Sequence, residues 1–280
     1  MTTTAKLHDG SSIEVTTLGD GPAMLLPASL ARPDDATAER MRAWGAEPGL
    51  GRHLADGLAA AGRRVIVADY EGHRAAHPAA ETLTAGNVAA DLLAIADAAG
   101  AREFGYYGYS WLGLSGLQLA VRTDRLTELA MGGFPPLGGP YGPMLEVTRA
   151  AHRMAVENVG RDLPDWTEIE VGDWDASEVT QTPEQTRQYV TLYESVRDFD
   201  ERAALRRLTV PRLAFAGRDD AIDFGAQWGN VRVELGPPLE THRAELEELG
   251  WAVEVLPGDH MGAMRSEVVL PLLTAHRVRA

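Results

Sequence analysis

The chain has 280 residues, of which 45% are hydrophobic and 24% charged, as expected for a globular protein with a sizeable core. Its length suits one α/β domain with an inserted subdomain. The net charge of −15 argues against binding to nucleic acid or to anionic membranes, both of which attract basic faces. The absence of cysteine excludes disulfides, thiol nucleophiles and thiolate metal ligands.

The N-terminal sequence MTTTAKLHDG predicts a cytoplasmic location. It lacks the basic start and apolar core of a secretory signal. The sequence also contains no run of about 18 apolar residues that could span a bilayer. The expected partner is therefore a small-molecule substrate rather than a nucleic acid or a membrane, and the sequence pattern indicates no particular oligomeric state.

The predicted elements alternate between strands and helices. Turn chemistry separates strands over 12–18 and 23–27, and a helix is expected within 32–62. The β-branched run at 63–70 predicts a strand buried on both faces. Further helices are expected at 84–100, 111–123, 238–249 and 270–278, and further strands at 102–108, 126–133, 210–217 and 251–258. This alternation predicts a mostly parallel sheet with helices on both faces.

Residues 135–207 interrupt the alternation. The segment begins with PPLGGPYGP, contains no run typical of a buried strand, and places Trp166 and Trp174 in predicted helical stretches. We interpret it as a helical cap inserted into a core formed by residues 1–134 and 208–280.

The stretch GYYGYSWLGLSGLQL (105–119) contains two serines that could act as nucleophiles. Ser110 lies where a predicted strand gives way to a predicted helix, the context in which a sharp turn exposes a serine side chain above a sheet. The first amides of the following helix favour negative charge there. Ser115 lies more than a turn inside the helix, where a hydroxyl is packed or bonded to a carbonyl. Ser110 is therefore the predicted nucleophile.

A serine nucleophile needs a base, and the base needs an orienting acid. His260 directly follows the last predicted strand, and Asp219 and Asp220 directly follow the strand before it. The carboxyl ends of parallel strands meet at the edge of the sheet where ligands bind. The chain order of Ser110, aspartate and His260 is also that of the α/β-hydrolase triad.

These motifs together resemble the α/β-hydrolase superfamily, in particular its lid-bearing serine hydrolases of the esterase and lactonase kind. The similarity is carried along nearly the whole chain by LGDGPAMLLPASL, VIVADYEGH, GYSWLG, AGRDD and GDHMGAM. It implies an eight-stranded, mostly parallel sheet with helices on both faces and an inserted helical cap. It also implies a triad of Ser110, Asp220 and His260, because the family's acid usually falls three residues after the glycine of AGRDD. Asp219 is the alternative acid.

The resemblance also implies an oxyanion hole formed by two backbone amides. The first lies just beyond a pair that is often His-Gly in the family and is Pro-Ala here, which assigns it to Ser29; the second is that of Trp111. Leu112 stands where the Gly-x-Ser-x-Gly pattern has its second glycine, and Gly113 supplies a small residue one position later. We expect the elbow backbone to form, with the leucine side chain accommodated by local repacking.

The predicted reaction is acyl transfer to Ser110 followed by hydrolysis, acting on an ester or lactone of an uncharged, partly apolar small molecule. The side chains expected to line the substrate site are Tyr109, Phe134, Tyr141, Met261 and Trp44. No metal or other cofactor is expected, since no set of His, Asp and Glu has metal-binding spacing. One alternative is carbon–carbon bond hydrolysis, or cofactor-free haloperoxidase or lyase chemistry, on the same triad. Another is a non-catalytic small-molecule binder on the same scaffold.

Overall fold

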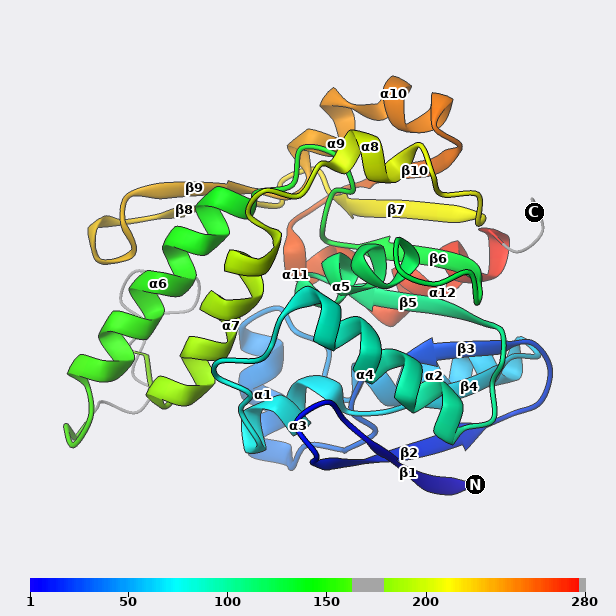
Figure 1. Cartoon of the computed structure of the whole chain (residues 1–280), viewed down its shortest axis with the longest axis horizontal. Helices are drawn as coiled ribbons and strands as arrows, with labels where there is room; N and C mark the ends of the chain where they lie inside the picture. Colours follow the sequence, from blue (N-terminus) through cyan, green and yellow to red (C-terminus); the bar gives the residue numbers. More distant parts are fainter. Residues whose placement is uncertain (163–178, 277–280) are drawn as a thin grey trace.

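An eight-stranded sheet runs through the centre of the computed structural model, which describes residues 1–162 and 179–276 (Figure 1). The strand order is β1-β2-β4-β3-β5-β6-β7-β10. β2 is antiparallel to both β1 and β4, and the other neighbours are parallel. The strands are β1 (Thr2–Lys6), β2 (Ser12–Leu18), β3 (Ala23–Leu26), β4 (Arg64–Val67), β5 (Phe104–Tyr109), β6 (Leu126–Gly132), β7 (Arg212–Gly217) and β10 (Trp251–Leu256). The predicted mostly parallel eight-stranded sheet is confirmed.

Helices cover both faces of this sheet, as predicted. α4 (Ala85–Ala98) and α5 (Trp111–Ala120) lie on one face, and α2 (Leu50–Ala60) and α12 (Ser266–His276) lie on the other (Figure 1). The other helices that the structure describes are α1 (Asp35–Ala43), α3 (Tyr70–Ala76), α6 (Tyr141–Glu157), α7 (Pro183–Val196), α8 (Glu201–Leu205), α9 (Pro237–Thr241), α10 (Arg243–Glu248) and α11 (His260–Ala263).

The central strands bury apolar side chains on both faces, because successive residues of a strand point to opposite sides. In β4, Val65 and Val67 belong to the cluster that contains α2 and α12, whereas Ile66 belongs to the cluster that contains α4 and α5. Tyr106 and Tyr107 of β5 divide in the same way. This two-sided burial requires a helix layer on each face, which is why the strand runs are almost continuously hydrophobic.

The chain leaves β4 earlier than the sequence predicts. α3 begins at Tyr70, inside the run expected to be a strand over 63–70. Asp69 caps this helix, because its Oδ1 accepts a hydrogen bond from the Gly72 N–H at 2.9 Å. The cap brings the first turn of α3 to the carboxyl edge of the sheet.

A hairpin that the sequence analysis did not predict follows β7. Its strands are β8 (Ala221–Phe224) and β9 (Val231–Glu234), joined by a 3₁₀ turn η2 (Ala226–Trp228). Each strand is only four residues long, too short to carry a clear hydrophobic period.

The chain between β6 and β7 carries α6, α7 and α8. α6 and α7 lie side by side and project beyond the sheet next to the hairpin (Figure 1). Glu201 fixes the loop that leads into α6, because its carboxylate accepts hydrogen bonds from the N–H groups of Gly138 and Gly139 at 2.7 and 2.8 Å. The boundaries of a separate cap at 135–207 stay a prediction, and Trp166 and Trp174 lie outside the described residues.

Candidate active site

Ser110 lies at a sharp turn between β5 and α5. Its φ of 56° is in the left-handed region, which is uncommon for residues other than glycine and often marks functional sites. Its N–H donates a hydrogen bond to the Gly132 carbonyl of β6 at 2.8 Å, and its own carbonyl accepts one from the Leu114 N–H at 3.1 Å. The strand–serine–helix turn therefore occurs at the residue that the sequence predicts.

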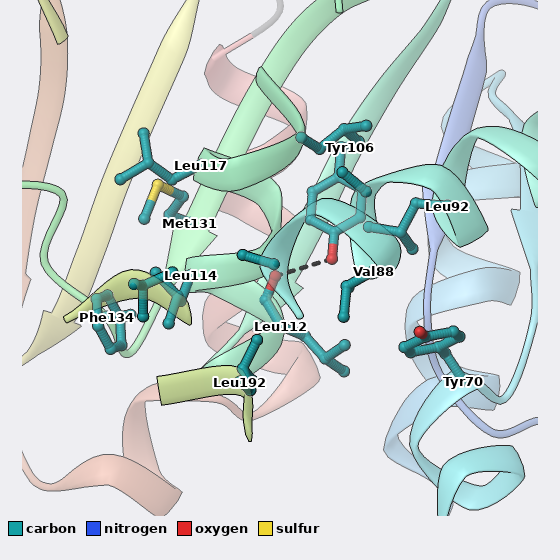
Figure 2. Close-up of a cluster of buried hydrophobic side chains, with 14 of the residues drawn as sticks. Tyr70, Val88, Leu92, Tyr106, Leu112, Leu114, Leu117, Met131, Phe134 and Leu192 are labelled. Atoms are coloured by element: carbon teal, nitrogen blue, oxygen red, sulfur yellow. Dashed lines mark hydrogen bonds between the residues drawn. The ribbon is translucent and has the colours of Figure 1, made fainter. Parts of the chain in front are cut away.

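Two glycines explain how this turn accommodates Leu112. A Cβ on Gly108 would come within 2.3 Å of the Leu112 carbonyl oxygen, and one on Gly113 would come within 2.9 Å of the Gly132 carbonyl oxygen. The Leu112 side chain is instead 7% exposed in the core, and its carbonyl accepts a hydrogen bond from the Tyr106 hydroxyl at 2.8 Å (Figure 2). Small residues are therefore needed at 108 and 113, where the turn touches neighbouring backbone. Position 112 tolerates leucine because its side chain packs in the core cluster that contains α4 and α5.

His260, the first residue of α11, is held by Asp220. The imidazole Nδ1 lies 2.7 Å from Asp220 Oδ2, where it donates a hydrogen bond. The Asp220 side chain is 0% exposed and that of His260 is 22% exposed. A buried carboxylate at Nδ1 fixes the tautomer that leaves Nε2 able to accept a proton. Of the two candidate acids, it is Asp220 and not the exposed Asp219 that contacts the histidine.

Tyr109 connects His260 to the serine turn. Its hydroxyl donates a hydrogen bond to the His260 carbonyl at 2.7 Å, and the two ring centroids are 4.8 Å apart. Burial raises the pKa of Tyr109 well above its usual range, and the charge of Asp220 raises this pKa further, so the hydroxyl stays a donor. A Cβ on Gly133 would lie 2.9 Å from His260 Cε1, so this glycine leaves room for the imidazole.

Ser29 and Trp111 lie at the same edge of the sheet. Ser29 follows β3, and Trp111 is the first residue of α5. Within residues 1–162 and 179–276, neither backbone N–H donates a hydrogen bond. Unpaired amides at such positions can stabilise an oxyanion. Their role as oxyanion donors stays a prediction.

A cavity of about 610 Å³ opens at this edge. It is lined by Ser110 and His260, by both predicted oxyanion residues, and by Tyr109 and Met261. Much of the remaining wall is apolar and includes Leu26, Pro33, Met41, Leu50, Leu54, Leu112 and Met264. The volume lies in the range of small-molecule sites. Among the described residues of 135–207, none lines the cavity.

Neither protein-family models nor curated proteins match the sequence. Solved structures match its architecture over nearly the whole length. An epoxide hydrolase from Vigna radiata covers 100% of this chain and 98% of its own, with 16% identity and a TM-score of 0.63. The enol-lactonase from Burkholderia xenovorans LB400 covers 98% and 99%, with 17% identity and a TM-score of 0.58. An esterase from Exiguobacterium antarcticum covers 100% and 98%, with 18% identity and a TM-score of 0.59.

The chain has the α/β-hydrolase fold. Within that fold, the serine turn follows β5, the aspartate follows β7 and the histidine follows β10. All three positions lie at the carboxyl edge of the parallel strands, which is where this fold places its nucleophile elbow and triad.

Three of the five predicted wall residues are not among the described residues that line the cavity, so their place in a substrate site stays a prediction. Phe134 and Tyr141 are 1% and 8% exposed and pack in the core, with ring centroids 5.7 Å apart. Tyr141 also contacts Phe199 at 6.2 Å. Trp44 ends α1 and is not among the described residues that line the cavity. The aromatic rings after β6 therefore pack the start of this connection against the core.

The sequence analysis missed Glu71, which lines the cavity from the first turn of α3. Its Oε1 accepts a hydrogen bond from the indole Nε1 of Trp111 at 2.9 Å. The signal that could have found it is its place just after β4, because side chains that follow parallel strands meet at one edge of the α/β-hydrolase sheet.

Within residues 1–162 and 179–276, no three His, Cys, Asp or Glu side chains are grouped so as to hold a metal ion. No helix described there has the length and apolar character needed to cross a membrane.

Proposed function

We propose that the protein is a serine hydrolase that cleaves an ester or lactone of a small, partly apolar molecule. The observation that carries the proposal is the hydrogen bond between Asp220 and His260, in a cavity that Ser110 also lines. A buried acid, an oriented imidazole and a strained serine at one edge are the parts that nucleophilic acyl transfer needs.

In the proposed mechanism, His260 Nε2 removes the proton of Ser110 as Oγ attacks the carbonyl carbon of the substrate. The carboxylate of Asp220 stabilises the imidazolium that forms. The amides of Ser29 and Trp111 donate hydrogen bonds to the oxyanion, and one such donor is worth about 2.7–4 kcal/mol of transition-state stabilisation. His260 then protonates the departing alkoxide. Water, deprotonated by the same imidazole, attacks the acyl-enzyme and releases the acid.

The cavity supports a substrate that is partly apolar and carries no negative charge. Leucine and methionine side chains form much of the wall, and methionine adapts to varied apolar shapes. Glu47, Asp69 and Glu71 are the acidic residues of the described lining, which would repel an anion. The proposed reaction uses side chains, backbone amides and water, so it calls for no cofactor.

The test is covalent labelling with a serine-reactive phosphonate, followed by mass spectrometry. We expect an adduct on Ser110 in the wild type and none in Ser110→Ala. Ser115→Ala is the matched control and should still be labelled at Ser110, because the buried Ser115 hydroxyl donates to the Trp111 carbonyl at 2.8 Å.

Turnover of p-nitrophenyl acetate, p-nitrophenyl butyrate and a lactone completes the test. The wild type should exceed Ser110→Ala in kcat by roughly 10⁴-fold or more. An adduct on Ser110 without ester or lactone turnover would favour carbon–carbon hydrolysis or haloperoxidase or lyase chemistry on the same triad. Neither adduct nor turnover would favour a non-catalytic binder and contradict the proposal.

A further inference from the structure

One carboxylate oxygen of Glu71, at the wall of the cavity, has no partner among the described residues. The residue is exposed, and its Oε1 is bonded to Trp111 Nε1 at 2.9 Å. Within the part of the chain that the structure describes, its Oε2 has neither a hydrogen bond nor an ion pair.

The other two carboxylates of the described lining already have structural partners. Glu47 accepts hydrogen bonds from the N–H and hydroxyl of Ser266, both at 2.7 Å. Asp69 caps α3 through Gly72. Of these three acids, only Glu71 accepts no hydrogen bond from a described backbone N–H and forms no ion pair with a described cationic side chain.

The described lining of the cavity contains no lysine and no arginine, and His260 is its single basic side chain. Apolar walls of low dielectric strengthen the field of a nearby charge, and the net charge of −15 adds to it. The indole bond ties Glu71 to the residue that directly follows Ser110. A positively charged group of a bound molecule would therefore meet an acceptor beside the proposed nucleophile.

Holding Trp111 in place does not require the negative charge. Its indole also contacts the ring of Tyr189 edge-on, with centroids 5.5 Å apart, and lies 6.1 Å from the ring of Tyr70. A glutamine at position 71 could accept the same indole hydrogen bond through its amide oxygen. A neutral side chain could therefore make the bond to the Trp111 indole. The negative charge of Glu71 is not needed for that bond and can interact with a ligand.

We propose that Glu71 is a specificity-determining residue that makes the cavity prefer esters and lactones carrying a positively charged nitrogen over neutral ones, and neutral ones over carboxylates. This inference rests on the hydrolase function proposed above. It replaces the uncharged substrate expected from the sequence with an organic cation.

The experiment compares kcat and KM for three acetate esters of similar length. These are the esters of choline, of 3,3-dimethylbutanol, in which carbon replaces the charged nitrogen, and of 3-hydroxypropanoate, which carries a carboxylate. The wild type should show a KM about fivefold lower for the choline ester than for its neutral isostere, the size expected of a partly exposed charge pair. The carboxylate ester should have the highest KM.

Glu71→Gln removes the charge and keeps the oxygen that Trp111 needs. It should bring the three KM values together. Glu248→Gln, an exposed substitution in α10 with the same change in net charge, should keep the wild-type ranking. If Glu71→Gln fails to fold, the wild-type preference should still shrink as salt screens the charge.

A wild-type ranking that ignores charge, or that Glu71→Gln or salt leaves unaltered, would overturn the inference. Turnover of the neutral ester would then still support the hydrolase proposal. An absence of turnover for all three esters, together with an absence of phosphonate adduct on Ser110, would overturn both.

Discussion

Segment 29–50 and the described part of the predicted insertion, residues 135–162 and 179–207, both belong to long connections between strands. Of these described residues, only those of 29–50 line the cavity. Segment 29–50 supplies Ser29, Ala31, Pro33, Met41, Ala46, Glu47, Gly49 and Leu50 to the wall. The insertion instead contacts one of the wall residues, because the ring of Tyr189 in α7 packs against the indole of Trp111.

Both regions are fastened by polar contacts, and the insertion also packs a ring against the core. Tyr141 contacts the buried Phe134, while in α7 Gln188 accepts a hydrogen bond from the Ala79 N–H at 3.2 Å and Thr191 donates one to the Ala80 carbonyl at 2.6 Å. Segment 29–50 is fastened by polar contacts: Glu47 binds Ser266 at the start of α12, and Arg52 donates to the Leu30 carbonyl at 3.2 Å. Both connections are long, so length alone does not decide which connection lines the cavity.

The largest expected effect is a loss of stability caused by a substitution at Phe134, which directly precedes the insertion. Phe134→Ala should lower the free energy of unfolding by about 3–5 kcal/mol, because it empties a fully buried ring site. Urea denaturation measures this loss. The ratio of kcat/KM for p-nitrophenyl butyrate to that for the acetate should not change, because Phe134 is off the cavity. A changed ratio of the two kcat/KM values would show that Phe134 does influence the cavity and would contradict the contrast between the two regions.

A comparable effect, on catalysis, is expected in α2. A Cβ on Gly51 would lie 2.3 Å from the Ser29 carbonyl oxygen, so Gly51→Ala must displace the proposed oxyanion residue. We expect kcat to fall roughly 100-fold with little change in KM. Gly57→Ala in the same helix is the matched control: its Cβ would meet the Leu270 side chain at 2.5 Å, which can move, and kcat should stay near wild type. Equal losses in the two variants would argue against the role of Ser29.

A smaller effect should come from the contact between α7 and the indole. Tyr189→Leu removes the edge-on contact with Trp111, worth about 0.5–1.5 kcal/mol beyond the buried area, and should lower stability by that order. Its kcat should fall less than that of Gly51→Ala. Tyr189→Phe keeps the ring and should match the wild type in thermal unfolding and in kcat. A loss of activity in Tyr189→Phe would mean that the hydroxyl, and not the ring, matters.

The smallest effect concerns the fastening of segment 29–50. Burial raises the pKa of Glu47, but hydrogen bonds from Ser266 and His53 outweigh it and hold this pKa below its ordinary value of 4.5. A lowered pKa in the folded state means that the ionised carboxylate stabilises the fold above about pH 4.5, and that this stabilisation is lost as the pH falls through the folded-state pKa.

Glu47→Gln should accordingly cost about 0.5–1 kcal/mol at neutral pH, because the site is partly exposed. The difference in Tm between this variant and the wild type should shrink as the pH is lowered from 7 to 3. A difference that stays constant over this range would show that the charge of Glu47 does not fasten the segment.

The sequence by itself determined the sheet, its helix layers and the places of Ser110 and His260. A strand buried on both faces must be almost continuously apolar, so it is visible as a run of residues. The ends of such strands then fix which loops share an edge. That is why the sequence alone predicts that a serine after β5 and a histidine after β10 share one edge of the sheet.

The resemblance already favoured Asp220, and the tertiary structure shows that it is Asp220, not Asp219, that contacts His260. Only the tertiary structure placed segment 29–50 in the wall and brought Glu71 to Trp111. Part of the wall, such as Ser29, Ala31 and Pro33, comes from an irregular segment without hydrophobic periodicity, and its position depends on the packing of distant helices. These features arise from long-range contacts, so they become visible only when the whole chain has folded.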